Sequence, residues 1–246
     1  MGGYTAPMPT IRMVGFDADD TLWHSETYFQ AAHAEFERIL GRYVDLADAG
    51  VHERLLATER ENIRLFGYGA KGMTLSMIET AIALSGERIS AADLHRIVAL
   101  GKSILQHPVE LLPGVREAVA AVAATHRVVL ITKGDLFHQE RKVAASGLSD
   151  LFQRIEIVSE KDEASYARLL REFEVEAGGF AMVGNSLKSD IAPVLALGGW
   201  GIHVPYPLVW ALERAEVDPA HPRFASVEHA SAVPAVLARW EEGVAA

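Results

Sequence analysis

The segment IRMVGFDADDT, residues 11–21, is a short apolar run that ends abruptly in a cluster of carboxylates. Such a run, followed at once by polar residues, is typical of a buried strand in a parallel sheet, where helices cover both faces. Four similar runs follow later in the chain, at residues 127–132, 154–159, 180–184 and 200–204. The chain therefore has five candidate strands, each followed by a polar or glycine-bearing loop.

Between and after the later runs, the apolar residues recur at helical spacing. Strand and helix patterns alternate strictly here, which predicts βαβ units and an open, doubly wound α/β sheet that is mainly parallel. The expected helices cover residues 116–124, 135–146, 163–173, 189–197 and 230–240.

The region from about Glu26 to Gln106 shows no strand pattern. It contains four stripes of apolar residues at helical spacing, which indicate four amphipathic helices inserted after the first strand. We therefore expect a core built from residues 1–24 and 108–246, with an inserted four-helix domain over residues 25–107.

The composition excludes several classes of protein. Half of the 246 residues are hydrophobic and 23% are charged, as in globular proteins. The absence of cysteine excludes disulfides, thiolate metal sites and cysteine nucleophiles. A net charge of −10 argues against binding of a nucleic acid polymer.

No apolar run is long enough to cross a membrane, and the start MGGYTA lacks a signal-peptide pattern. We therefore expect a cytoplasmic protein with no membrane partner. The sequence pattern does not indicate an oligomeric state.

In an open α/β sheet the functional site lies beyond the carboxyl ends of the strands. Four of the five candidate strands lead to residues suited to catalysis or to binding phosphate. The candidates are Asp17 and Asp19 after the first strand, Thr132, Lys133 and Gly134 after the second, Lys161 after the third, and Asn185 and Asp190 after the fourth.

Asp17 and Asp19 are two residues apart, so at a strand end we expect both to point to one face. Asp190, at the start of its helix, is expected to approach them. Three carboxylates this close would repel by several kcal/mol at an effective dielectric constant of about 20, so the cluster needs a cation. Hard oxygen ligands favour Mg²⁺, and Lys161 supplies a second positive charge. The hydroxyl and backbone amides after the second strand are suited to hold phosphate oxygens.

This arrangement resembles the haloacid dehalogenase superfamily over nearly the whole chain. Residues 16–21, FDADDT, resemble its first motif, DxDxT, and residues 184–190, GNSLKSD, resemble its fourth, GDSxxxD. Thr132 and Lys161 match the hydroxyl residue of the second motif and the lysine of the third. The helical insertion is similar to the all-helical (C1-type) cap of the family's phosphatase branch.

The resemblance implies catalysis by two carboxylates. Asp17 is then the nucleophile, which forms an aspartyl-phosphate, and Asp19 is the general acid for the leaving group and later the general base for water. Lys161 neutralises charge on the phosphoryl group. The implied phosphate-binding residues are Thr132, Lys133, Gly134 and Lys161, and the implied Mg²⁺ ligands are Asp17, Asp19 through its backbone carbonyl, Asp190 and Asn185.

One departure from the family pattern bears on the reaction. Asn185 stands where most phosphatase members have a metal-binding aspartate, so metal binding should be weaker, and either Asn185 or Asp190 can be the direct ligand. Dehalogenases of the superfamily need no metal and lack the second aspartate of the first motif. Asp19 therefore favours a phosphatase over a 2-haloacid dehalogenase. The further alternative is a catalytically silent binding protein.

The expected function is thus Mg²⁺-dependent hydrolysis of a small phosphorylated metabolite. The segment FDADDTL, residues 16–22, is similar to that of family members acting on nucleoside monophosphates. A nucleoside 5′-monophosphate is therefore the first substrate to consider, with sugar phosphates and phosphoglycolate still open.

Overall fold

The structure is a computed structural model that describes residues 11–245, so the N-terminal segment discussed above lies outside it. The chain forms two compact units. The first comprises the chain up to His24, Val109–Thr132 and the chain from Val143 onwards. The second comprises Ser25–Pro108 and Lys133–Lys142.

The first unit is built on a six-stranded sheet with the order β3-β2-β1-β4-β5-β6. The pairings of β1 with β2 and β4, of β4 with β5, and of β5 with β6 are all parallel. This confirms the predicted doubly wound α/β class. The strands are β1 (Met13–Phe16), β2 (Arg127–Lys133), β3 (Arg154–Val158), β4 (Phe180–Gly184), β5 (Trp200–His203) and β6 (Phe224–Ser226).

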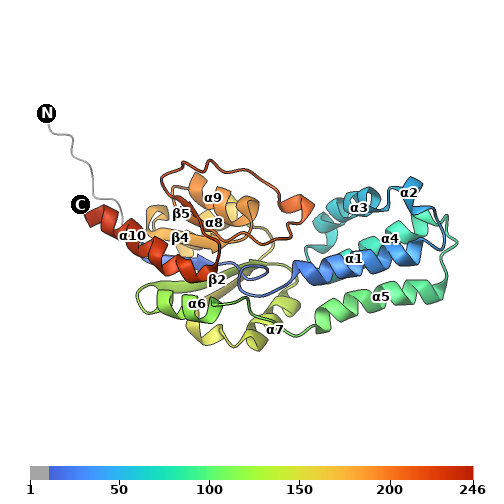
Figure 1. Cartoon of the computed structure of the whole chain (residues 1–246), viewed down its shortest axis with the longest axis horizontal. Helices are drawn as coiled ribbons and strands as arrows, with labels where there is room; N and C mark the ends of the chain where they lie inside the picture. The colour runs from blue at the N-terminus through green and yellow to red at the C-terminus, as the bar shows by residue number, and fades with distance from the viewer. Residues whose placement is uncertain (1–10, 246) are drawn as a thin grey trace. The chain divides into compact units, whose positions relative to one another are not determined.

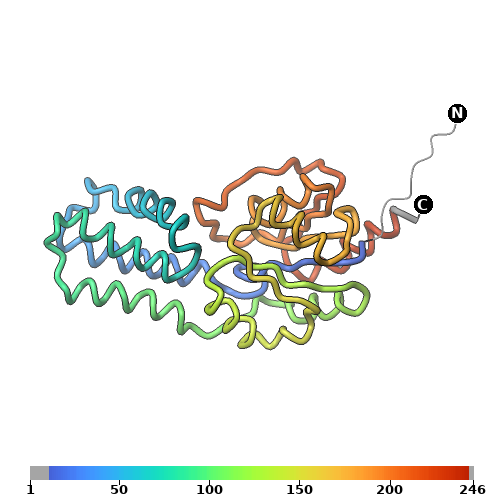
Figure 2. The backbone as a smooth tube through the Cα atoms, turned by 180° about the vertical axis from the view of Figure 1, so that it is seen from behind, coloured from blue at the N-terminus to red at the C-terminus, as the bar shows by residue number. Residues whose placement is uncertain are grey.

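Helices cover both faces of this sheet (Figures 1 and 2). Val14 and Phe16 of β1 face a core shared with α6 and α10, whereas Met13 faces a second core shared with α8 and α9. Successive residues of a strand point to opposite faces, so one apolar run supplies both cores. The helices are α6 (Val115–Ala123), α8 (Glu163–Phe173), α9 (Ala192–Ala196) and α10 (Val233–Ala245). The remaining helix, α7 (Leu136–Ser146), begins in the second unit and ends in the first.

Two elements differ from the sequence-based expectation. The helix expected at residues 189–197 divides into a π-helical turn, η3 (Leu187–Ile191), and the short α9. The backbone N–H groups of Asp190 and Ile191 both donate to the carbonyl of Ser186, at 2.9 and 3.3 Å, which widens this turn. β6 was not expected, because three residues form no recognisable apolar run.

The second unit is helical and has its own core, formed by residues such as Phe36, Leu55, Met77 and Ile97. Its four long helices correspond to the four predicted stripes, and a single-turn helix is added between the first two. It also includes Lys133–Lys142, which the sequence-based division assigned to the core. The helices are α1 (Glu26–Leu40), α2 (Leu46–Ala49), α3 (Val51–Phe66), α4 (Ala70–Leu84) and α5 (Ala91–Gln106).

The chain leaves the first unit at His24 and returns at Val109, and the flanking segments are paired there. The N–H of His24 donates to the carbonyl of Glu110 at 3.1 Å, and the N–H of Leu112 donates to that of Leu22 at 2.9 Å. Among residues 11–245, no helix is long and apolar enough to cross a membrane.

Within the second unit, α4 and α5 pack closely at Gly101. A Cβ atom at this position would lie 1.9 Å from Oγ1 of Thr74. We expect Gly101→Ala to lower the free energy of unfolding by about 1–3 kcal/mol, although alanine favours a helix, because overpacking outweighs helix propensity. Denaturant unfolding measures the change. Adding Thr74→Ala, which removes the clashing oxygen, should recover part of the loss; no recovery would contradict the packing argument.

Candidate active site

The site begins at the turn that follows β1. The strand ends at Phe16, and the N–H of Asp17 donates to the carbonyl of Val183 in β4 at 2.9 Å. Asp20 adopts a left-handed backbone conformation with φ of 63°, which aspartate tolerates better than most residues. This tight turn brings the side chain of Thr21 back to Asp17.

The Lys161 ammonium group joins two carboxylates that are far apart in sequence. Its Nζ donates to Oδ1 of Asp17 at 2.5 Å and to Oδ1 of Asp190 at 2.8 Å. All three side chains are buried. The predicted convergence of the carboxyl ends of β1, β3 and β4 therefore occurs for these three residues, and the positive charge of the lysine offsets one of the two negative charges.

Burial changes the proton affinity of this cluster. Loss of solvation raises the pKa of Asp17 to about 7; Lys161 opposes the change, and Asp190 and Asp19 add to it. Burial acts to lower the pKa of Lys161, but Asp17 and Asp190 outweigh it and hold this pKa well above its ordinary value. Lys161 thus stays protonated, and one further cation near Asp17 would favour the ionised form of Asp17.

Thr21 holds the second oxygen of the Asp17 carboxylate. Its Oγ1 donates to Oδ2 of Asp17 at 2.8 Å and accepts a bond from the N–H of Asn185 at 3.0 Å. The same Oγ1 lies 3.2 Å from Oδ1 of Asn185. The side-chain oxygens of Asp17 and Asn185 therefore converge on one hydroxyl group.

Asp190 is held by its own turn. Its Oδ2 accepts a bond from the N–H of Ser186 at 2.9 Å, while its Oδ1 accepts from Lys161. A Cβ atom on Gly184 would lie 2.2 Å from Oδ2 of Asp190, so only glycine lets the carboxylate approach the end of β4 this closely. Ser186 caps the turn by accepting the N–H of Ser189 at 3.0 Å.

The expected cluster of three carboxylates needs correction. Asp19 lies in the turn and not on the strand, and its Oδ1 accepts a bond from Nε1 of Trp23 at 2.6 Å. The two side-chain oxygens of Asp190 accept hydrogen bonds from Lys161 and from the N–H of Ser186. Within the described part of the chain, no three His, Cys, Asp or Glu side chains gather in a way that could hold a metal ion.

The oxygen donors at this site nevertheless suit Mg²⁺. Asp17 offers a carboxylate and Asn185 an amide oxygen, and both are hard ligands. The side-chain oxygens of Asp17 and Asn185 both lie at the hydroxyl group of Thr21, whereas the two oxygens of Asp190 accept hydrogen bonds from Lys161 and Ser186.

The predicted phosphate-binding residues at the end of β2 fall in different units. Thr132 is buried at the end of the strand in the first unit. Lys133 and Gly134 belong to the second unit, where Nζ of Lys133 lies 4.2 Å from the ring centroid of Tyr68 and Gly134 has φ of 139°. A phosphate-binding role for these three residues stays a prediction.

The sequence analysis assigned no role to several residues that shape the site. Thr21 stands within the DxDxT pattern, which could have drawn attention to its hydroxyl. Nε2 of His203 donates to the backbone carbonyl of Asn185 at 3.1 Å, and Oε2 of Glu213 accepts from Oγ of Ser186 at 2.6 Å. No local sequence pattern signals these last two contacts.

Comparison with known proteins places these features in context. The family described as haloacid dehalogenase-like hydrolase matches residues 11–198. A haloacid dehalogenase-like family hydrolase from Xanthomonas campestris is 55% identical, with a TM-score of 0.88, over 96% of this chain and 99% of that chain.

Two further solved structures share the fold at lower identity. A 2-haloacid dehalogenase from Pseudomonas syringae pv. Tomato is 23% identical, with a TM-score of 0.60, over 94% of this chain and 100% of that chain. A predicted phosphoglycolate phosphatase from Haemophilus somnus is 16% identical, with a TM-score of 0.60, over 93% and 99%. No curated protein matches the sequence.

The raised pKa of Asp17 predicts a specific pH dependence of stability. Because the folded-state pKa of about 7 exceeds the ordinary 3.8, ionisation of Asp17 opposes folding progressively as the pH rises between these values. Relative to the parent chain, Asp17→Asn should therefore gain stability from about pH 4 to pH 7 and level off above. Denaturant unfolding with a chelator present, at several pH values, measures this difference.

Asp48→Asn, which removes the carboxylate of an exposed aspartate, provides the matched control. A difference between Asp17→Asn and the parent that stays constant with pH would contradict the raised pKa.

Proposed function

Because the chain belongs to the haloacid dehalogenase-like hydrolases, we propose that it is a Mg²⁺-dependent phosphomonoester hydrolase acting on a small phosphorylated metabolite. The observation that carries the proposal is the carboxylate of Asp17, held by Lys161 and Thr21, with a second carboxylate, Asp19, in the same turn. The first is suited to attack phosphorus, and the second to move the proton that an ester leaving group needs.

In the proposed reaction, an oxygen of Asp17 forms a bond to phosphorus as the ester P–O bond breaks, and the leaving oxygen takes a proton from Asp19. Water then attacks the aspartyl-phosphate and gives its proton to Asp19, and the bond from Asp17 to phosphorus breaks to release phosphate. Lys161 and Thr132 are proposed to neutralise and orient the phosphoryl group. Lys133 and Gly134 are proposed to add backbone contacts to it.

Trp23 supports the proposed role of Asp19. The indole N–H donates to Oδ1 of Asp19 at 2.6 Å, and the Trp23 side chain is buried in the core of the first unit. A carboxylate held from one side by a rigid aromatic group has a fixed orientation for proton transfer.

The proposed ligands for Mg²⁺ are Asp17, the backbone carbonyl of Asp19, and Asn185. When bound, the ion would offset negative charge on the transferring phosphoryl group. We assign Asp190 to positioning of Lys161, because one of its oxygens binds that ammonium group at 2.8 Å.

The second candidate is a 2-haloacid dehalogenase. The amide at Asn185 favours it, because it removes one negative charge that a divalent ion would prefer. Asp19 argues against it, since a halide leaves without a proton. A silent binding protein is the remaining alternative, although the buried Lys161 between two carboxylates is an arrangement that a binding role alone does not require.

A substrate panel separates these functions. We expect phosphate release from nucleoside 5′-monophosphates, sugar phosphates or phosphoglycolate that depends on added Mg²⁺ and is abolished by Asp17→Asn. Release of inorganic phosphate measures this activity. Halide release from 2-haloacids without metal would replace the proposal by the dehalogenase, and silence on both panels would favour the binding protein.

Asp19 provides a sharper test of the chemistry. Asp19→Asn keeps an acceptor for the indole N–H of Trp23 but cannot move a proton, so kcat on a phosphate ester should fall by about 10²–10⁴-fold. Steady-state kinetics on the best substrate of the panel measures the change. Glu216→Gln, an exposed change in the loop before β6, is the control and should keep full activity. An unchanged kcat in Asp19→Asn would contradict its acid–base role.

A further inference from the structure

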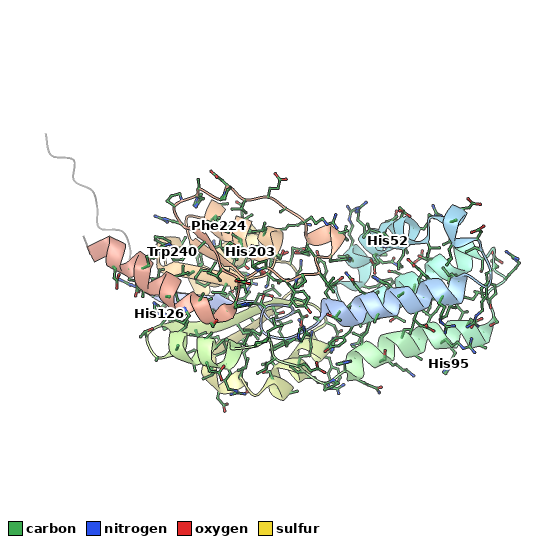
Figure 3. All side chains as sticks on the ribbon, in the orientation of Figure 1. His52, His95, His126, His203, Phe224 and Trp240 are labelled. Carbon is green, nitrogen blue, oxygen red and sulfur yellow. The ribbon has the colours of Figure 1, made fainter. Side chains whose placement is uncertain are left out.

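Glu213 lies outside every motif of the sequence but contacts the turn that carries Asp190. It ends the short helix η4 (Ala211–Glu213) in the loop between β5 and β6. His203 and Phe224, labelled in Figure 3, stand at the two ends of this loop. Oε2 of Glu213 accepts hydrogen bonds from Oγ of Ser186 at 2.6 Å and from Oγ of Ser189 at 2.5 Å.

These hydrogen bonds are of the stronger kind. Both serines are buried, and short bonds from a hydroxyl group to a carboxylate exceed neutral ones in strength. A third contact joins the same segments, because Nζ of Lys188 donates to the carbonyl of Leu212 at 2.6 Å. The η4 segment and the η3 turn are thus connected at three points.

Ser186 contacts Asp190 directly, and Ser189 contacts Ser186. Ser186 donates its N–H to Oδ2 of Asp190, and its carbonyl accepts the N–H of Asp190 at 2.9 Å. Oγ of Ser186 also accepts the N–H of Ser189. A shift of Ser186 would therefore move the carboxylate that binds Lys161, and with it the neighbouring Asn185.

The same loop is anchored a second time, at its beginning. The hydroxyl of Tyr206 lies 2.7 Å from Nδ1 of His24, which follows the first motif. One loop therefore contacts the segments of both the first and the fourth motif within the first unit.

We propose that Glu213 is a positioning residue: its carboxylate holds Ser186 and Ser189 and thereby fixes Asp190 and Asn185. The catalytic consequence rests on the proposed function, whereas the structural consequence does not. Residues that orient metal ligands through hydrogen bonds typically contribute about 10- to 100-fold to metal affinity or activity.

The test compares Glu213→Gln with the parent chain, both full length. Amide hydrogen exchange of residues 186–191 in metal-free protein should become faster in the variant. The reason is that the side-chain oxygen of the new glutamine accepts the hydrogen bonds from Ser186 and Ser189 more weakly than a carboxylate does. Half-maximal activity should require about 10-fold more Mg²⁺, and the rise in Tm that Mg²⁺ causes should shrink. Glu216→Gln, an exposed change on the same loop, should alter none of these.

A double-mutant cycle tests the route of the effect. If Glu213 acts through the serines, Glu213→Gln should change exchange less in a Ser189→Ala background than in the parent. Equal effects in both backgrounds, or exchange of residues 186–191 that matches the parent, would overturn the proposal. A parent without phosphatase activity but with faster exchange in Glu213→Gln would refute the proposed function alone.

Discussion

The site depends on one buried ammonium group between two buried carboxylates. Without Lys161, Asp17 and Asp190 would face each other in a poorly solvated space, and removing one partner of a buried ion pair is strongly destabilising. The parallel sheet makes this meeting possible, because β1 and β4 are neighbours and both end at the same edge. Even with the lysine in place, burial keeps the pKa of Asp17 near 7. Ionising Asp17 in the site therefore lowers the stability of the fold.

Much of this arrangement could be predicted from local sequence. The apolar runs identified five of the six strands, and polar residues after them identified Asp17, Lys161 and Asp190, since these signals extend over only a few residues. Asp17 and Asp19 were expected at a strand end, whereas β1 ends at Phe16 and the carboxylate of Asp19 is held by the indole N–H of Trp23. The contacts of Glu213 were not predictable, since they depend on how a long loop packs against a turn 24 residues away in sequence.

Fold and chemistry carry different weight in assigning the reaction. Dehalogenases and phosphatases share this architecture, and likeness at 23% or 16% identity does not distinguish them. Asp19 favours the phosphatase reaction, whereas Asn185 favours the dehalogenase reaction. Asp19 changes which leaving group can be expelled, whereas Asn185 changes only the charge of one ligand, so the first has the greater influence on the proposed reaction.

The hydrogen-bonded pairing of the segments around His24 and Val109 has a consequence for the evolution and engineering of this chain. Both ends of the long insertion lie side by side in the first unit, joined by bonds from His24 to Glu110 and from Leu112 to Leu22. An insertion whose ends meet in this way can change in length or be exchanged without forcing the flanking strands apart. The helical segment can therefore be exchanged as a whole, while the residues around Lys161 are left as they are.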